Sequence, residues 1–132
     1  MRKKIYEIMN TKVETIPAEA TVYEAIERLI DKRIRSLLVL PKNEKDEPGV
    51  VTVRNIIFKV LARKLDPQKV KISEISSKPI IAVSKDATLE EVLKLMEKHN
   101  IARVFIKEGN QILGVVSFFD LMNYILIERA KK

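Results

Sequence analysis

The chain has 132 residues, a length that allows one compact unit or two small halves that share a core. Hydrophobic residues make up 46% and charged residues 33%, which is globular composition, and the absence of cysteine excludes disulfides and thiolate chemistry. The net charge of +7 favours anionic partners such as nucleotides, nucleic acid or an acidic protein surface. The first ten residues lack the apolar run of a signal peptide, and no apolar stretch approaches the roughly 20 residues that span a bilayer. We therefore expect a cytoplasmic protein with no membrane partner.

The first half of the chain is predicted to run strand, helix, strand, strand, helix. An extended stretch at 13–16 precedes Thr21, which has Glu24 three residues later, the capping-box signature of a helix start. The apolar residues of that helix recur at helical spacing: Val22, Ala25, Ile26, Leu29 and Ile30. Two β-rich stretches follow at 37–40 and 50–53, joined by a polar turn that is bounded by proline.

The second half repeats this order. The positions of Thr88 and Thr21 differ by 67 (88 − 21), and Thr88 has the same capping-box spacing. Gly114 and Gly49 differ by 65 (114 − 49), because the loop before Gly114 is two residues shorter. In that loop Gly109 is available for the positive φ of a tight hairpin. The corresponding extended stretches are 80–83, 104–106 and 112–116.

A polar link bounded by proline separates the two halves. We divide the chain into a first repeat at 1–65, the link at 66–79 and a second repeat at 80–132. The last helix of each repeat is apolar on most of its circumference, so it has to be covered on more than one side. One side can meet the sheet of its own repeat, and the other needs the second repeat or another chain. We therefore predict a homodimer.

Each final helix opens on the same motif, which is GVVTVRN ending at Asn55 and GVVSFFD ending at Asp120. A hydroxyl residue, Thr52 or Ser117, lies three positions before that end, which is the spacing of a helix cap and has a purely structural interpretation. The same geometry suits a nucleotide. The N–H groups at a helix start attract a phosphate, and a carboxylate can accept hydrogen bonds from both hydroxyls of a ribose. The glycine of the motif is expected to leave room for a planar base.

The order of elements and the recurring segments resemble a tandem pair of cystathionine-β-synthase (CBS) domains, a Bateman module. The segments that carry the resemblance are TVYEAI, RIRSLLVL and GVVTVRN in the first half, and ATLEEVLKLMEKHNIARVFI and GVVSFFD in the second. The resemblance extends from about Ile5 to Leu126. It implies an α/β fold of two pseudo-symmetric repeats packed through their sheets, with no catalytic activity and two clefts between the repeats for an adenosyl ligand.

In the better cleft, the resemblance implies that Asp120 holds the ribose and that Ser117 approaches the phosphate. Arg103, in the segment NIARVF, occupies the family's position for a cationic phosphate contact. Asp120 matches the family's acidic residue, so this cleft is ranked first.

Four further residues complete that cleft by the same resemblance. The backbone of the facing strand, around Val13 and Glu14, would read the adenine edge. Ala102 and Phe119 would help to wall the pocket.

The second cleft departs from the family pattern. Asn55 replaces the expected acid, and an amide offers one acceptor oxygen where a carboxylate offers two. Ser36 lies where the other repeat has Arg103, although nearby arginines could supply the charge. We rank this cleft as the weaker one. Its expected residues are Thr52, Arg54, Asn55, Ile80, Ile81 and Arg35.

The sequence is thus interpreted as a non-catalytic regulatory module whose ligand is AMP, ADP, ATP or S-adenosylmethionine, with no other cofactor. It would signal through its own oligomer or through an unknown effector protein. His99, the only histidine, has no thiol or second histidine to share a zinc ion with, so no metal site is expected. Two alternatives remain open: a basic protein that binds nucleic acid, and a purely structural dimerisation module.

Overall fold

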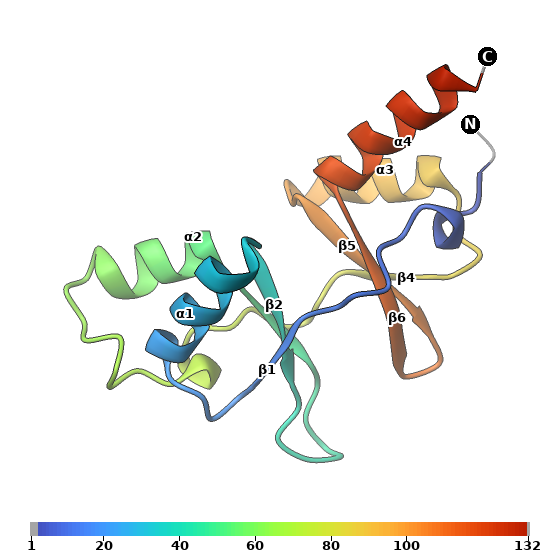
Figure 1. Ribbon diagram of the computed structural model, residues 1–132. Helices are drawn as coiled ribbons and strands as arrows, with labels where there is room; N and C mark the ends of the chain where they lie inside the picture. Colours follow the sequence, from blue (N-terminus) through green and yellow to red (C-terminus); the bar gives the residue numbers. More distant parts are fainter. Residues whose placement is uncertain (1–2, 132) are drawn as a thin grey trace. The chain divides into compact units, whose positions relative to one another are not determined.

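The protein forms two compact units, each built on a three-stranded sheet flanked by helices (Figure 1). The computed structural model describes residues 3–131. One unit runs from Glu14 to Ile80, and the other combines the residues up to Val13 with those from Ile81 onwards. The predicted mixed α/β fold of two repeats is confirmed.

The unit from Glu14 to Ile80 follows the predicted order of elements. Its elements are β1 (Thr15–Pro17), α1 (Val22–Lys32), β2 (Ser36–Leu40), β3 (Gly49–Thr52), α2 (Val53–Ile56), the π-helical η2 (Ile57–Leu61) and the 3₁₀ turn η3 (Ile72–Glu74). β1 pairs with β2 in parallel, and β2 pairs with β3 in antiparallel. The final helix of the repeat therefore starts as α2 and widens into η2.

The other unit repeats this plan. Its elements are the 3₁₀ turn η1 (Ile5–Glu7), β4 (Ala82–Ser84), α3 (Leu89–His99), β5 (Arg103–Glu108), β6 (Gln111–Ser117) and α4 (Phe118–Ala130). β4 pairs with β5 in parallel and β5 with β6 in antiparallel, with Gly109 at φ +60° in the hairpin as predicted. No helix in this part of the chain, or elsewhere in residues 3–131, has the length and apolarity needed to span a bilayer.

Local capping explains where the long helices begin. The Thr21 hydroxyl accepts a hydrogen bond from the Glu24 N–H at 3.1 Å, and Thr88 forms a complete capping box with Glu91. Both helix starts are therefore confirmed. Each of these helices ends at a residue in the left-handed conformation, Arg33 for α1 and Asn100 for α3.

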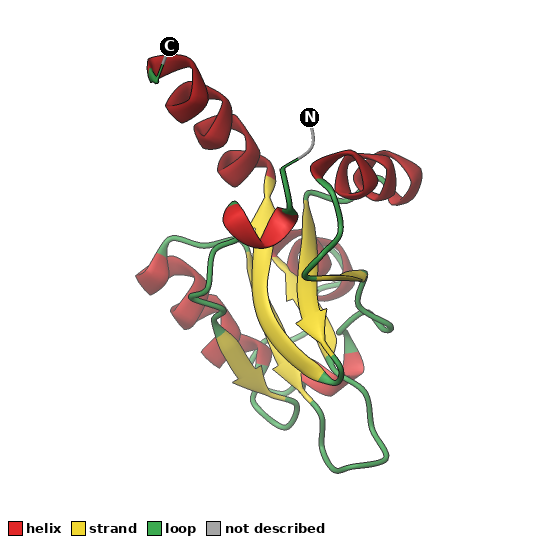
Figure 2. Cartoon of the chain, turned by 90° about the vertical axis from the view of Figure 1, so that its right-hand side faces the viewer, coloured by secondary structure: helices red, strands yellow, loops and turns green. Residues whose placement is uncertain are grey.

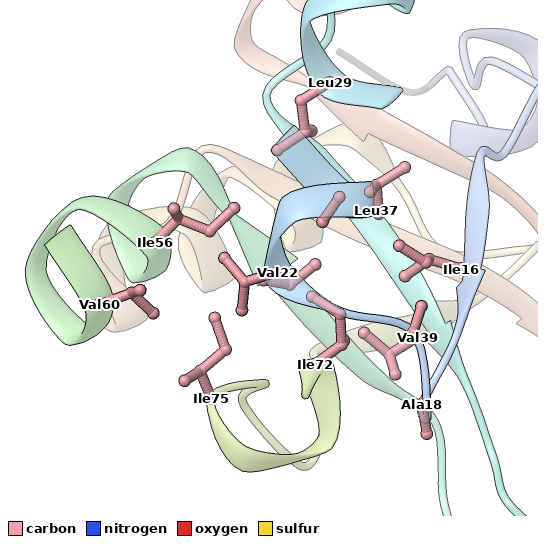
Figure 3. Close-up of a cluster of buried hydrophobic side chains, with 13 residues drawn as sticks. Ile16, Ala18, Val22, Leu29, Leu37, Val39, Ile56, Val60, Ile72 and Ile75 are labelled. Carbon is pink, nitrogen blue, oxygen red and sulfur yellow. The ribbon is translucent and has the colours of Figure 1, made fainter. Parts of the chain in front are cut away.

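The core of the unit from Glu14 to Ile80 lies between its sheet and its helices (Figure 3). Its most deeply buried side chains are Ile16, Val22, Ala25, Leu37, Val39, Val51, Val60 and Ile72. Residues 66–79, expected to be a link, thus contribute Ile72 and also Ile75 to this core. The repeats read from the sequence and the compact units of the structure are different divisions of the chain.

Each unit contains the leading segment of the other repeat. In one unit the Ile5 N–H donates to the Ala87 carbonyl at 2.9 Å, and in the other the Ile72 N–H donates to the Ala20 carbonyl at 2.8 Å. These bonds are equivalent, because Ile72 follows Ile5 by 67 positions (72 − 5) and Ala87 follows Ala20 by 67 (87 − 20). In Figure 1 the blue N-terminal segment accordingly runs beside β6. The leading segments are exchanged reciprocally.

The motif glycines serve this exchange. A Cβ added to Gly114 would lie 2.7 Å from Met9 Sδ and 2.8 Å from the Asn10 carbonyl oxygen, and Asn10 pairs with Val115. At Gly49 the nearest atom would be the Ser77 carbonyl oxygen at 3.1 Å. The expectation that this glycine makes room for a base is therefore wrong, because the leading segment of the same unit fills that space.

Replacing Gly114 by alanine should lower the free energy of unfolding by about 1–3 kcal/mol, because a backbone carbonyl has to move away from the new methyl group. Gly49→Ala is the matched comparison and should cost less, since its closest contact is 3.1 Å. Urea unfolding of both variants measures the difference. Equal stability of Gly114→Ala and the wild-type protein would contradict this explanation of the glycine.

Asp46 ties the β2–β3 loop to the segment after η3. Its Oδ1 lies 2.7 Å from Lys78 Nζ, and its Oδ2 accepts a hydrogen bond from the Lys42 N–H at 2.9 Å. The hydrogen bond from Lys78, followed by that from Lys42, lowers the pKa of Asp46 from 3.8 to about 2.

A carboxyl pKa that folding lowers adds stability above its unfolded value, and this stability is lost as the pH falls through its folded value. The stability difference between wild type and Asp46→Asn should therefore be full above about pH 4 and shrink as the pH approaches 2. Urea midpoints measured from pH 6 down to pH 2 test this. Glu44→Gln in the same loop controls for the loss of a negative charge. A pH-independent difference for Asp46→Asn would count against the ion pair.

Candidate functional site

The start of α4 is built on Ser117 and Asp120. Ser117 is the last residue of β6, and α4 continues directly from that strand towards the C label in Figure 2. The Asp120 N–H donates to Ser117 Oγ at 3.3 Å, while the Ser117 N–H and hydroxyl donate to Asp120 Oδ2 at 2.8 and 3.0 Å. This is a complete capping box, so the structural interpretation of the motif is confirmed.

The capping box uses only one of the two carboxylate oxygens of Asp120. Both hydrogen bonds that Asp120 accepts in it fall on Oδ2. Oδ1 has no part in the box, and a carboxylate oxygen can accept two hydrogen bonds. The side chain is half-buried at the positive end of the α4 helix dipole. Asp120 can therefore cap its helix and still present an acceptor to a ligand hydroxyl.

Neighbouring strands bring two further predicted residues to this helix start. Arg103 is the cross-strand partner of Ser117 in the β5–β6 ladder. The Phe118 N–H, the first of α4, donates to the Ala102 carbonyl at 3.0 Å. Directly paired residues of an antiparallel sheet project on the same face. The structure thus brings Ala102 and Arg103 beside Ser117 and Asp120, combining hydroxyl, guanidinium and carboxylate groups.

The remaining predicted residues of the main cleft occupy different positions. Phe119 lies in the first turn of α4 and its side chain is 62% exposed. Val13 is the last residue of the leading segment in the same unit, and Glu14 is the first residue of the other unit. The Glu14 carbonyl accepts a hydrogen bond from the Leu38 N–H at 2.9 Å, and its carboxylate lies 3.7 Å from Lys32 Nζ.

The equivalent position in the other repeat is the start of α2. Thr52 and Asn55 form a capping box in which Asn55 Oδ1 accepts from the Thr52 N–H at 3.0 Å. Because this is the single acceptor oxygen of the amide, the cap engages the group that a ribose would need. The helix is also short here, since α2 has four residues before it widens into η2.

The other predicted residues of the second cleft surround that start only in part. The Arg35 carbonyl accepts from the Val53 N–H at 3.0 Å, so Arg35 corresponds to Ala102. The Arg54 guanidinium lies 5.1 Å from the centre of the Phe58 ring, a cation–π contact along the helix. Ile80 ends one unit and Ile81 begins the next stretch of the other.

Lys3 contacts α4 and was not predicted from the sequence. Its ammonium lies 3.6 Å from Glu7 and 3.6 Å from Glu128, and 5.8 Å from the centre of the Tyr124 ring. The negative charge of Glu128 raises the pKa of Lys3. No local signal marks this contact, because Lys3 and Glu128 lie near opposite ends of the chain.

No metal centre is assigned. Within residues 3–131, histidine, aspartate and glutamate side chains do not gather in groups of three or more that could hold an ion.

Comparison with known proteins identifies the fold. A profile of the CBS domain matches residues 5–62 and 72–127, one match over each repeat. The chain belongs to the CBS-domain family. The two matches also agree with the reciprocal exchange, because they begin at Ile5 and at Ile72.

Individual relatives support the same assignment. An uncharacterised protein of Methanocaldococcus jannaschii is 33% identical over 110 residues, which cover 81% of this chain and 58% of that protein. The chain spans about three-fifths of the length of this relative and of a similar one from Methanopyrus kandleri.

Solved structures are similar as well. A hexameric CBS-CP12 protein from bloom-forming cyanobacteria superposes with a TM-score of 0.85 at 34% identity, covering 92% of this chain and 67% of that one. An uncharacterised conserved protein from Pyrococcus horikoshii has a TM-score of 0.85 at 26% identity, covering 94% and 92%. The chain is a CBS pair, a kind of module that is generally regulatory and non-catalytic.

Proposed function

We propose that this CBS pair is a non-catalytic sensor that binds an adenosine nucleotide, or another adenosyl compound, at the start of α4. The observation that carries the proposal is the arrangement of Asp120, whose Oδ2 caps the helix while Oδ1 stays outside the capping box. A ribose presents two neighbouring hydroxyls, which are donors that suit an acceptor-only carboxylate.

The phosphate would lie towards Ser117 and Arg103. Ser117 offers a hydroxyl at the helix start, and Arg103 is its partner in the ladder. A guanidinium binds phosphate with directed N–H donors, and the helix dipole adds attraction for negative charge. We therefore expect tighter binding of adenosine phosphates than of adenosine. AMP, ADP, ATP and S-adenosylmethionine all satisfy the ribose requirement.

The second position is proposed as the weaker one. Asn55 has its acceptor oxygen in the cap, and Ser36 takes the ladder position that Arg103 has in the other repeat. The start of α2 therefore lacks both the acceptor and the ladder cation that support the first position.

Ligand binding would regulate by favouring one of two arrangements of the protein, with no bond broken. The output would pass through self-association, as a homodimer, or through an effector protein. The exposed apolar helices α2–η2 and α4 support self-association. A cytoplasmic location remains a prediction from the sequence.

A thermal-shift panel tests the proposal. The ligands are AMP, ADP, ATP, NAD, S-adenosylmethionine and a short DNA duplex, each with wild type and with Asp120→Ala. A ligand at 100 times its dissociation constant adds about 2.7 kcal/mol of stability. We expect a shift with at least one adenosyl compound that Asp120→Ala abolishes.

The same panel separates the alternatives. A shift with the duplex alone, falling steeply with salt, would instead indicate nucleic-acid binding. No shift with any ligand would leave a purely structural dimerisation module, for which the exposed apolar helices are the supporting observation.

A further inference from the structure

Helix α4 carries an apolar face that its own unit does not cover. We define the α4 face as Phe118, Met122, Ile125 and Leu126, which recur at helical spacing and are between 52% and 68% exposed. The opposite side of α4 holds the helix to its unit, chiefly through the partly buried Leu121 and Tyr124. A contiguous exposed patch of this kind marks an interaction surface.

The helical segment α2–η2 carries a second such face. We define the α2 face as Val53, Ile57, Phe58 and Leu61, which are between 39% and 55% exposed. Ile56 and Val60, on the other side of the same segment, are buried in the core. The two faces thus occupy equivalent positions in the two repeats.

The charges around the two faces have opposite signs. The sequence holds no aspartate or glutamate between Glu47 and Asp66, whereas this stretch contains Arg54, Lys59, Arg63 and Lys64. These four basic residues therefore surround or adjoin the α2 face without any acidic residue among them.

The α4 face shows the reverse pattern. The sequence holds no lysine or arginine between Lys107 and Arg129, whereas this stretch contains Glu108, Asp120 and Glu128. Asp120 and Glu128 belong to α4 itself, one near each end. The α4 face thus has an apolar centre whose nearest helical charges are acidic.

We propose that the α2 face of one copy of the chain packs against the α4 face of a second copy. Opposite rims attract in this pairing, whereas two α2 faces would bring eight basic residues together. An anionic membrane would suit the α2 face but not the acidic surroundings of the α4 face. A second copy is the one occupant that satisfies both. The proposal specifies the self-association proposed above and does not depend on nucleotide binding.

Site-directed cross-linking tests the pairing, because the chain has no cysteine of its own. Ala62→Cys and Asn123→Cys place one thiol beside each face and leave its apolar residues intact; both positions are exposed. The two variants are unfolded and refolded together or separately, without nucleotide, and treated with a short bismaleimide. We expect the mixture to give about tenfold more cross-linked dimer than either variant alone, with the cross-link joining position 62 to position 123.

Three results would overturn the proposal. Cross-links of 62 to 62 or of 123 to 123 as the main products would show pairing of like faces. A monomer by light scattering, without cross-links, would show that neither face pairs with a second copy. A monomer that binds vesicles containing anionic phospholipid would assign the α2 face to a membrane. Because nucleotide is absent throughout, none of these results bears on the ligand proposal.

Charge reversal adds an independent test. Arg63→Glu with Lys64→Glu should weaken self-association by about tenfold at low salt and by less at high salt. Lys94→Glu with Lys98→Glu, on the exposed side of α3, makes the same change in net charge away from both faces and should leave association unchanged. Equal effects of the two pairs would contradict a role for the rim of the α2 face.

Discussion

Replacing Asp120 by asparagine should weaken adenosine nucleotide binding by about tenfold or more, because a hydrogen bond to a charged group contributes about 1.5–3 kcal/mol. The variant should nevertheless keep the cap of α4. Asn55 does the equivalent work at the start of α2, where its Oδ1 accepts from the Thr52 N–H at 3.0 Å. The remaining cost is the loss of one negative charge at a helix N-terminus, about 0.3–1 kcal/mol of stability. Calorimetric titration gives the affinity and urea unfolding gives the stability.

The internal repeat offers a matched control for this experiment. Asn55→Asp makes the reverse exchange at the equivalent cap and should leave nucleotide affinity at the start of α4 unchanged. A fall in affinity for Asn55→Asp as large as for Asp120→Asn would mean that the effect is a general one on the fold. Wild-type affinity in Asp120→Asn would contradict the proposed contact with the ribose.

Replacing Ile5 by alanine should lower the free energy of unfolding by about 2–5 kcal/mol, although Ile5 lies in the leading segment of the chain. The side chain is fully buried, and the core around it is formed by α3, β5 and β6. The loss should therefore appear in the unit that contains residues 81–131. Urea unfolding measures the total effect, and hydrogen exchange of α3 and β5 amides locates it.

Two variants complete this test. Ile72→Ala is the equivalent change in the other repeat and should reduce protection in α1 and β2 instead. Tyr6→Ala, next to Ile5 but 46% exposed, should cost well under half as much as Ile5→Ala. If Ile5→Ala reduced the protection of α1 and β2 rather than that of α3 and β5, the exchange of leading segments would be incorrect.

Features governed by nearby residues were predictable from the sequence. The starts of α1 and α3 follow from Thr21 and Thr88, because a cap is formed within four residues. The hairpin at Gly109 follows from local turn chemistry in the same way. β1 and β4 begin two residues later than expected, since the chain passes between units at Val13–Glu14 and at Ile80–Ile81.

Features governed by distant residues were missed. The exchange of leading segments depends on pairings such as that of Asn10 with Val115, which no local pattern encodes. A signal was nevertheless present. The segment KIYEI begins at Lys4 and KISEI begins at Lys71, 67 positions apart (71 − 4), so the repeat starts earlier than its capped helices suggest.

The candidate site was predictable only in its parts. The pairing of hydroxyl and carboxylate at the start of α4 follows from the spacing of Ser117 and Asp120. Which carboxylate oxygen the cap uses could not be read from that spacing, since it depends on side-chain geometry. The role of Gly114 was misjudged for a related reason. The atoms that need its small size belong to Met9 and Asn10, more than a hundred positions away.

A nucleotide cycle tests the central claim most directly. The affinities of AMP and of its 2′-deoxy and 3′-deoxy analogues are measured by calorimetry with wild type and with Asp120→Asn. If the carboxylate accepts from the ribose, wild type should lose about tenfold in affinity when a contacted hydroxyl is removed, whereas the variant should lose little more. The same loss in both proteins would show that Asp120 does not hold the sugar.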